Sequence, residues 1–256
     1  MSARAWVGFV TLLHKELIRF WKVALQTVLA PVINALLYLL IFSHVLESHV
    51  EVYPGVSYTA FLMPGLVMMS MLQNAFANSS SSLIQSKITG NIVFVLLPPL
   101  SHLEFFAAYL IAAIVRGLVV GAGVMLVGAL FTDLPLAHPG WILAFAISAS
   151  AAFGALGIVA GIWADKFDHL AGIQNFVILP LTFLSGVFYS IHSLPAVWQT
   201  LSHYNPVFYM IDGFRYGFLG ESDVSPWHAF AVVLPFALAL AALSWRLLQS
   251  GYKLRH

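Results

Sequence analysis

Six stretches of the chain carry almost no charged side chains, and they limit what the chain can fold into. They span residues 24–45, 58–77, 105–131, 141–164, 172–189 and 227–249. A helix needs about 20 mostly apolar residues to cross a bilayer, because the hydrocarbon core is about 30 Å thick. The pattern therefore predicts an all-α membrane protein with six transmembrane helices. Kinks are expected at the prolines inside these runs, which are Pro31, Pro64, Pro180 and Pro235.

The composition excludes a water-soluble fold. Only 8% of the residues are charged and 61% are hydrophobic, whereas a soluble domain has about 25% charged residues. A formal net charge of +1 gives no sign of a nucleic-acid partner. The chain has no cysteine, which excludes disulfides and cysteine-bound metals. The expected partner of most of its surface is the lipid bilayer.

The distribution of Lys and Arg predicts the orientation in the membrane. On the side of the N-terminus lie Arg4, Lys15, Arg19, Lys22, Lys87, Lys166, Arg246, Lys253 and Arg255. The opposite side holds Arg215 together with the acidic residues Glu47, Glu51, Asp133, Asp212, Glu221 and Asp223. Cytoplasmic loops are enriched in Lys and Arg. Both termini are therefore predicted to be cytoplasmic, which agrees with an even number of spans.

Residues 1–23 have the pattern of an amphipathic helix. One face is apolar and carries Trp6, Phe9, Val10, Leu13, Leu17, Phe20 and Trp21. The other face carries Gly8, Thr11, Lys15, Arg19 and Lys22. Because charged side chains enter hydrocarbon at a high cost, we expect this helix to lie in the cytoplasmic interface, with its basic face toward the lipid headgroups. The alternative is an N-terminal extension of the first span.

No motif assigns catalytic, cofactor-binding or metal-binding residues to this chain. The chain lacks a Gly-x-x-x-x-Gly-Lys-Ser/Thr sequence, so it has no P-loop for ATP hydrolysis. His44, Glu47, His49 and Glu51 cluster in the first outer loop. Such side chains can bind a metal, but an ordinary solvated loop is the favoured interpretation. We therefore expect that this chain is not an enzyme.

Arg116 is a basic residue well inside a predicted span. A buried arginine needs a partner or a water-filled surface. It either lines a substrate path or makes a fixed structural contact, and the fixed contact is slightly favoured. Asp165 and Asp168 are candidate partners.

Two pairs of glycines in the third and fourth predicted spans are spaced for close helix packing. Gly117 and Gly121 are four residues apart, as are Gly157 and Gly161. Small residues at this spacing let helices approach closely. The pairs serve either packing within one subunit or contact between subunits.

Residues 193–217 are too polar for a single straight span and too aromatic for an ordinary solvated loop. Pro195 and Pro206 break the segment, and aromatic residues lie between Trp198 and Phe214. Asp212 and Arg215 are three residues apart and share a face if this part is helical. If the pair is shielded from water, removing one partner is costly. If it is exposed, the pair has little energetic consequence.

The region from Ile178 to Arg215 resembles the signature of type-2 ABC transporter permeases, the ABC-2 family. The matching residues are Ile178, Leu181, Leu184, Ser185, Val187, Leu194, Pro195, Pro206, Tyr209 and Arg215. The order of elements, with a basic amphipathic N-terminus before six spans, also fits this family over essentially the whole chain. The chain looks most similar to bacterial inner-membrane permeases related to exporters of lipo-oligosaccharides and polysaccharides. Residues 24–250 are accordingly expected to form an ABC type-2 transmembrane domain.

The resemblance implies a re-entrant pair of short helices at about residues 190–222, before the last span. This hairpin would dip into the outer leaflet and return, and would close the outer end of the transport pathway. The residues that fall at this outer gate are Pro195, Pro206, Tyr209, Asp212 and Arg215.

The resemblance also implies a coupling helix at about residues 86–101, which transmits motion from an ATPase subunit. The residues expected to couple to the ATPase are Lys87, Gly90, Asn91, Val93, Phe94 and Pro99. The family often has acidic residues two before and three after the glycine, where this chain has Ile88 and Val93. A more apolar docking groove is therefore expected on the ATPase.

Together these features predict the permease subunit of an ATP-driven exporter in a bacterial inner membrane. The resemblance implies a separate ATPase that carries ATP and Mg²⁺, and two permeases with two ATPases, as a homodimer or with a similar permease. The few charges in the spans favour a lipidic, amphipathic or saccharide-type substrate. The alternatives are a nucleotide-independent channel or secondary transporter, and an intramembrane enzyme.

Overall fold

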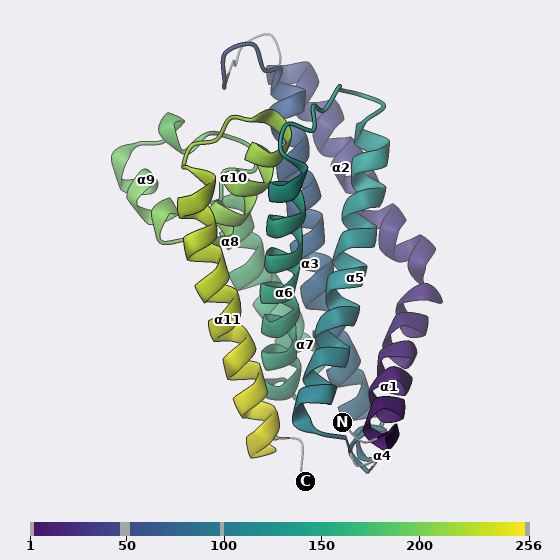
Figure 1. Cartoon of the computed structure of the whole chain (residues 1–256). Coiled ribbons are helices and arrows are strands. Elements are labelled where there is room, and N and C mark those ends of the chain that lie inside the picture. The colour runs from purple at the N-terminus through teal and green to yellow at the C-terminus, as the bar shows by residue number, and fades with distance from the viewer. Residues whose placement is uncertain (1–2, 47–51, 98–99, 254–256) are drawn as a thin grey trace.

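The computed structural model describes residues 3–46, 52–97 and 100–253, and within these ranges every regular element is a helix. The chain forms an elongated bundle in which the two ends marked N and C lie at the same end (Figure 1). The helices, in chain order, are α1 Ala3–Trp21, α2 Ala24–Leu46, α3 Tyr58–Ile88, α4 Ile92–Leu96, α5 His102–Gly128, α6 Pro139–Trp163, α7 Phe167–Ile173, the π-helix η1 Gln174–Ile178, α8 Leu179–Phe183, the 3₁₀-helix η2 Ile191–Ser193, α9 Ala196–His203, α10 Pro206–Leu219 and α11 Pro226–Ser250.

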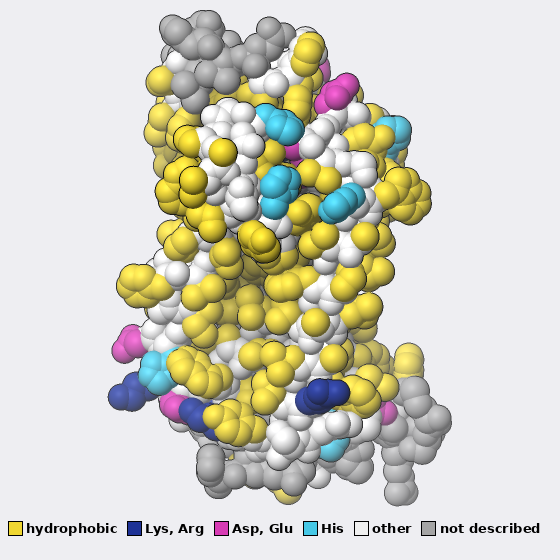
Figure 2. All heavy atoms as spheres, turned by 90° about the vertical axis from the view of Figure 1, so that its left-hand side faces the viewer, with side chains coloured by type: hydrophobic (Ala, Val, Ile, Leu, Met, Phe, Trp, Pro, Cys, Tyr) yellow, Lys and Arg dark blue, Asp and Glu magenta, His cyan; other side chains and the backbone are white. Residues whose placement is uncertain are grey.

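Five helices in the described part of the chain are long and apolar enough to cross a membrane: α2, α3, α5, α6 and α11. They correspond to five of the six predicted spans. Hydrophobic side chains cover most of the face shown in Figure 2, and the Lys and Arg side chains on that face gather at its lower end. This is the surface expected for a protein embedded in a bilayer.

The fifth predicted span, residues 172–189, is not a single long α-helix. It is built from α7, η1 and α8, and the helical stretch ends at Phe183. Pro180 has no N–H group to donate within the helix. A wider π turn precedes it, in which the Leu179 N–H donates to Gln174 O. The structure therefore describes five continuous spanning helices, and a sixth span through this segmented region stays a prediction.

Helix α3 is the centre of the bundle and is buried on nearly all sides. It packs mainly against α5 and α6. A Cβ atom at Gly157 would lie 2.4 Å from the Phe76 carbonyl oxygen, and one at Gly117 would lie 2.8 Å from Ser150 Oγ. The glycine pairs of α5 and α6 thus permit close contact between helices of the same subunit.

Candidate functional site

Two short helices, α9 and α10, lie toward the end of the bundle opposite the termini (Figure 1). The sequence dictates the break between them. Asn205 caps α10 with its side-chain oxygen, which accepts from the Val207 N–H at 3.0 Å. Pro206 occupies the first turn, where its missing N–H costs nothing. The Asn205 amide also donates to Leu181 O at 2.7 Å, which ties the break to α8.

Helix α10 is buried among α3, α6 and α11 although it is not one of the long spans. Gly213 and Gly217 allow this position, because a Cβ atom at either would collide with α6, at Phe145 and Ile142 respectively. This pair is spaced four residues apart like the pairs in α5 and α6, and the spacing is visible in the sequence. Sequence reasoning nevertheless missed it.

Arg215 anchors α10 to two other parts of the chain. Its Nε donates to Phe61 O at 3.2 Å and its Nη2 donates to Gly186 O at 2.7 Å. The guanidinium also lies over the Phe61 ring, 3.8 Å from the ring centroid. The side chain is almost completely buried. Arg215 therefore joins α10 to the first turn of α3 and to the turn after α8.

Asp212 anchors the connection from α10 to α11. Its two carboxylate oxygens accept from the Asp223 and Val224 N–H groups, both at 2.9 Å. The Asp212 and Arg215 side chains approach to 3.9 Å and both are buried. The interpretation of this pair as solvent-exposed was therefore wrong.

Asp223 is a member of this network that sequence reasoning missed. Its side chain accepts from the Tyr53 hydroxyl at 2.9 Å, from Ser190 Oγ at 2.7 Å and from the Ile191 N–H at 2.8 Å. Burial raises the pKa of Tyr53 above its ordinary value. Nothing in the local sequence distinguishes Asp223 from other loop acids, because its three donors come from distant segments.

Two of the predicted gate residues lie nearer the rim. Pro195 precedes the first turn of α9. The Tyr209 hydroxyl donates to His203 O at 3.0 Å, and its ring stacks with His228. Tyr209 thus links α10 to the end of α9 and to α11.

At the other end of the bundle, a tight turn presents a small apolar helix. Gly90 has a φ of +72°, a conformation that favours glycine, and it turns the chain from α3 into α4. Asn91 stands at the N-cap of α4 without a side-chain capping bond. Val93 is 52%, Phe94 71% and Leu97 69% exposed. Pro99 lies outside the described residues.

Lys87 does not belong to this exposed surface. Its ammonium donates to Ile162 O at 2.9 Å and to Ala164 O at 2.5 Å, and Asp165 lies 3.7 Å away. Lys87 therefore satisfies the last carbonyl groups of α6. Asp165 in turn accepts from Lys253 Nζ at 2.7 Å.

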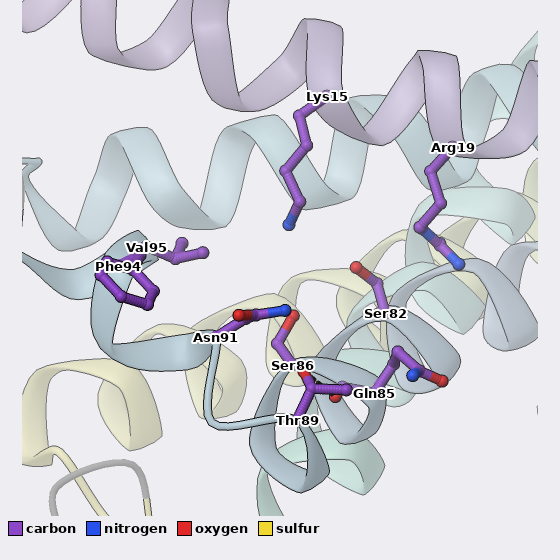
Figure 3. A pocket seen from close by; sticks show the side chains of 9 residues that line it. All are labelled: Lys15, Arg19, Ser82, Gln85, Ser86, Thr89, Asn91, Phe94 and Val95. Carbon is purple, nitrogen blue, oxygen red and sulfur yellow. Dashed lines mark hydrogen bonds between the residues drawn. The ribbon is translucent and has the colours of Figure 1, made fainter.

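Helix α1 is fixed to the bundle by a buried carboxylate that sequence reasoning missed. Glu16 is fully buried and accepts from Lys15 at 3.0 Å, from Arg19 at 3.2 Å and from Ser82 Oγ at 2.7 Å. Arg19 also donates to Asn78 O at 2.7 Å. In Figure 3, Lys15 and Arg19 point from α1 toward α3. The expectation that this basic face meets lipid headgroups was wrong for Arg19, because α3 offers a polar surface to it.

Arg116 has a neutral partner. Its Nη2 donates to Asn74 Oδ1 at 3.2 Å, and the guanidinium lies 5.8 Å from the Phe20 ring centroid. The candidate partner Asp165 contacts Lys253 and Lys87 instead. These contacts join α5 to α3 and to the end of α1, which agrees with the interpretation of Arg116 as a fixed structural contact.

The described residues contain no group of three or more His, Cys, Asp or Glu side chains placed to hold a metal. Glu47, His49 and Glu51 lie outside the described residues, as does the His44 side chain.

The structure defines a multi-pass helical membrane protein that has the exposed α9 and the buried α10 at one end and the exposed α4 at the other. Residues 7–219 match the family model described as "ABC-2 type transporter", and the chain belongs to this family.

Curated relatives cover nearly the whole chain. The chain is 38% identical over 250 residues to the "Inner membrane transport permease YadH" of Escherichia coli K12, covering 98% of both chains. It is 29% identical over 255 residues to "Nodulation protein J" of Rhizobium leguminosarum bv. trifolii, covering 95% of both. It is 26% identical to "Nodulation protein J" of Rhizobium meliloti, with 97% of both chains covered. These similarities agree with a multi-pass permease of a bacterial inner membrane.

Proposed function

We propose that this permease is the membrane half of an ATP-driven exporter, and that a separate P-loop ATPase docks on α4. The observation that carries this proposal is the exposure of Val93 and Phe94 on α4 and of Leu97 directly after it, at the end where Lys and Arg gather. Exposed apolar side chains grouped outside the bilayer call for a covering partner. Gly90 and the anchored end of α3 give the helix a rigid base on which a push could act.

The cap made by α9 and α10 is the proposed outer gate. Opening it requires α10 to leave its contacts with Phe61 O and Gly186 O, which Arg215 holds. The proposed assembly contains two ATPases and two permeases. Both termini of each permease lie at its cytoplasmic end. A lipidic, amphipathic or saccharide-type cargo is favoured because the long spans carry few charges.

A nucleotide-independent channel or secondary transporter is the second candidate. A transporter coupled to ions uses charged groups within its spans. In the described spans the charged side chain nearest the middle is Arg116, and its partner Asn74 is neutral. This arrangement favours the ATP-driven mechanism.

Copurification tests the proposal. The permease is expressed with candidate ATPases of the same cell, and a P-loop ATPase is expected to copurify with it. Val93→Glu and Phe94→Glu should release that ATPase, because a charge is placed in an apolar contact. Leu130→Glu is the matched control, since Leu130 is an equally exposed apolar residue at the opposite end. Retention of the ATPase by both α4 variants places the docking surface elsewhere, and the absence of any copurifying ATPase favours the second candidate.

A further inference from the structure

Two adjoining cavities lie between α1, the end of α3 and α4. The first, called the polar chamber because most of the residues that line it are polar, has a volume of about 380 Å³ and is lined by Lys15, Arg19, Ser82, Gln85, Ser86, Thr89, Asn91, Phe94 and Val95 (Figure 3). The second also has about 380 Å³ and is lined by Gly8, Thr11, Leu12, Lys15, Phe94, Val95 and Leu100. Lys15, Phe94 and Val95 line both cavities, so the two chambers share a wall.

The polar chamber is suited to an anion. Two cations line it, from Lys15 and Arg19, and its lining contains no carboxylate. Glu16 lies beside these cations, but its buried carboxylate already accepts from Lys15, Arg19 and Ser82. The excess is one positive charge. Within the described residues Lys15 donates a hydrogen bond to Glu16 alone, which leaves donors of its ammonium for a ligand.

The apolar chamber is suited to hydrocarbon. Leu12, Val95 and Leu100 contribute aliphatic side chains and Phe94 contributes a ring. Gly8 lets Leu100 pack directly against α1, because a Cβ atom there would lie 2.6 Å from Leu100 Cδ2. A free phosphate ion would fill the polar chamber and leave the apolar one unused. A ligand with an anionic head and an apolar tail matches both.

The depth of the site agrees with such a ligand. Helix α3 has 31 residues, which at 1.5 Å per residue is about 46 Å, so it is longer than the hydrocarbon core of about 30 Å. Its C-terminal turns, with Ser82, Ser86 and Thr89, therefore extend toward the headgroup region at the end where Lys and Arg gather. A chamber at this depth is within reach of lipid phosphates.

We propose that the paired cavities between α1 and α4 bind a phosphate-headed lipid of the cytoplasmic leaflet, with the phosphate at Lys15 and part of the tail against Gly8, Leu12 and Leu100. The bound lipid joins α1 to α4, two elements that share these chambers. The inference goes beyond the transport function, since it concerns the permease alone and does not need the ATPase.

Lipid binding to the purified full-length permease tests this inference. The probes are dioleoyl phosphatidic acid, dioleoylglycerol, which lacks the phosphate, and glycerol 3-phosphate, which lacks the tails. Native mass spectrometry is expected to retain phosphatidic acid and not dioleoylglycerol, and millimolar glycerol 3-phosphate should not displace the lipid. Displacement by glycerol 3-phosphate would overturn the assignment to a lipid in favour of a free phosphate compound.

Variants connect the binding to the two chambers. Lys15→Gln should weaken phosphatidic acid binding about tenfold, because one charge-assisted contact is lost. Gly8→Leu should weaken it similarly by filling the apolar chamber, and the flexible end of Leu100 can move to admit the new side chain. Lys22→Gln is the matched control, an exposed cation of the same segment that lines neither chamber. An equal loss in Lys22→Gln would show general surface attraction and overturn the proposal.

The same variants distinguish a lipid in the two chambers from a protein that binds there. If Lys15→Gln and Gly8→Leu leave lipid binding unchanged and reduce copurification of the ATPase, the chambers belong to the protein interface and the lipid proposal is wrong. If they reduce lipid binding while Val93→Glu does not, the lipid site stands whether or not the ATPase docks on α4.

Discussion

Asp212 and Arg215 lie one turn apart on α10, are both buried, and approach each other only to 3.9 Å. Each has shorter contacts to backbone groups of other segments. Arg215 is 2.7 Å from Gly186 O, and Asp212 is 2.9 Å from the Asp223 and Val224 N–H groups. The pair therefore acts as two adjacent anchors that also neutralise each other, so that α10 is held to α3, to the turn after α8 and to the start of α11.

Removal of either anchor should lower the stability of the protein more than removal of an exposed charge. Arg215→Ala leaves a buried carboxylate without its cation and removes the hydrogen bonds to Phe61 O and Gly186 O. We expect a loss of about 3 to 5 kcal/mol in stability, measured by thermal unfolding of the purified protein. The double variant Asp212→Asn/Arg215→Ala should lose less than the sum of the two single variants, because the sites are coupled.

A matched control for this prediction is Arg246→Ala, which removes an exposed arginine of α11 and should change stability by less than about 0.5 kcal/mol. The gate proposal adds a second readout. Arg215→Ala should impair export while the ATPase still copurifies. Wild-type export by both single variants would contradict the gate.

The buried carboxylate of Glu16 should hold α1 against α3. Glu16→Ala removes the acceptor shared by Lys15, Arg19 and Ser82, and leaves these groups without it in a partly buried site. The expected cost is about 1 to 3 kcal/mol, seen as faster amide hydrogen exchange in α1 while exchange in α6 stays slow. Lys22→Ala should leave α1 protected, and unchanged exchange in Glu16→Ala would show that apolar contacts alone hold the helix.

The orientation of the protein in the membrane can be determined by labelling single introduced cysteines, since the chain has none of its own. Cysteines at Thr89 and Lys166 should react with an impermeant maleimide only after the membrane is opened. Cysteines at Asp133 and Glu221 should react in cells whose inner membrane is intact. The exposed Thr89 is a better probe than Lys87, whose side chain is engaged with α6. External labelling at Thr89 would reverse the orientation.

Asp165 should make the C-terminal end of α11 sensitive to acid. The hydrogen bond from Lys253 holds the pKa of Asp165 below its usual value. Desolvation partly opposes this effect, and the positive charges of Lys253 and Lys87 add to it. A carboxyl whose pKa is lowered on folding stabilises the fold above its unfolded pKa of about 3.9 and loses this contribution as the pH falls through the folded pKa. The contact is therefore expected to persist at neutral pH and to open below about pH 4.

A bimane label on Tyr252→Cys measures this opening. The ammonium of the adjacent Lys253 lies 5.8 Å from the centroid of the Trp163 ring, and a tryptophan near the label quenches its fluorescence. Fluorescence should rise as the pH falls below about 4. With Asp165→Asn added, it should be high at neutral pH as well. A pH profile that Asp165→Asn leaves unchanged would assign the effect to another group.

Much of this protein follows from its sequence alone. The length of the apolar runs determines the spanning helices, because a bilayer admits few other ways to satisfy backbone hydrogen bonds. Gly90, Asn205 and Pro206 determine local turns through their own backbone preferences. The Lys and Arg pattern predicts an orientation, and the signature around Pro195, Pro206 and Arg215 predicted the family. These are properties of short segments or of averages over many residues.

The tertiary structure decided the partners. Arg116 meets Asn74 and not an aspartate, Lys87 caps α6 instead of facing outward, and Glu16 and Asp223 become centres of hydrogen-bond networks. Each of these contacts joins residues that are distant along the chain. Which polar group a buried charge meets depends on the packing of several helices at once, and helical periodicity constrains a face without naming its neighbour. The break of residues 167–183 into α7, η1 and α8 likewise depends on the packed bundle. Pro180 has no N–H group to donate, and the surrounding structure decides how the nearby carbonyl groups find other donors.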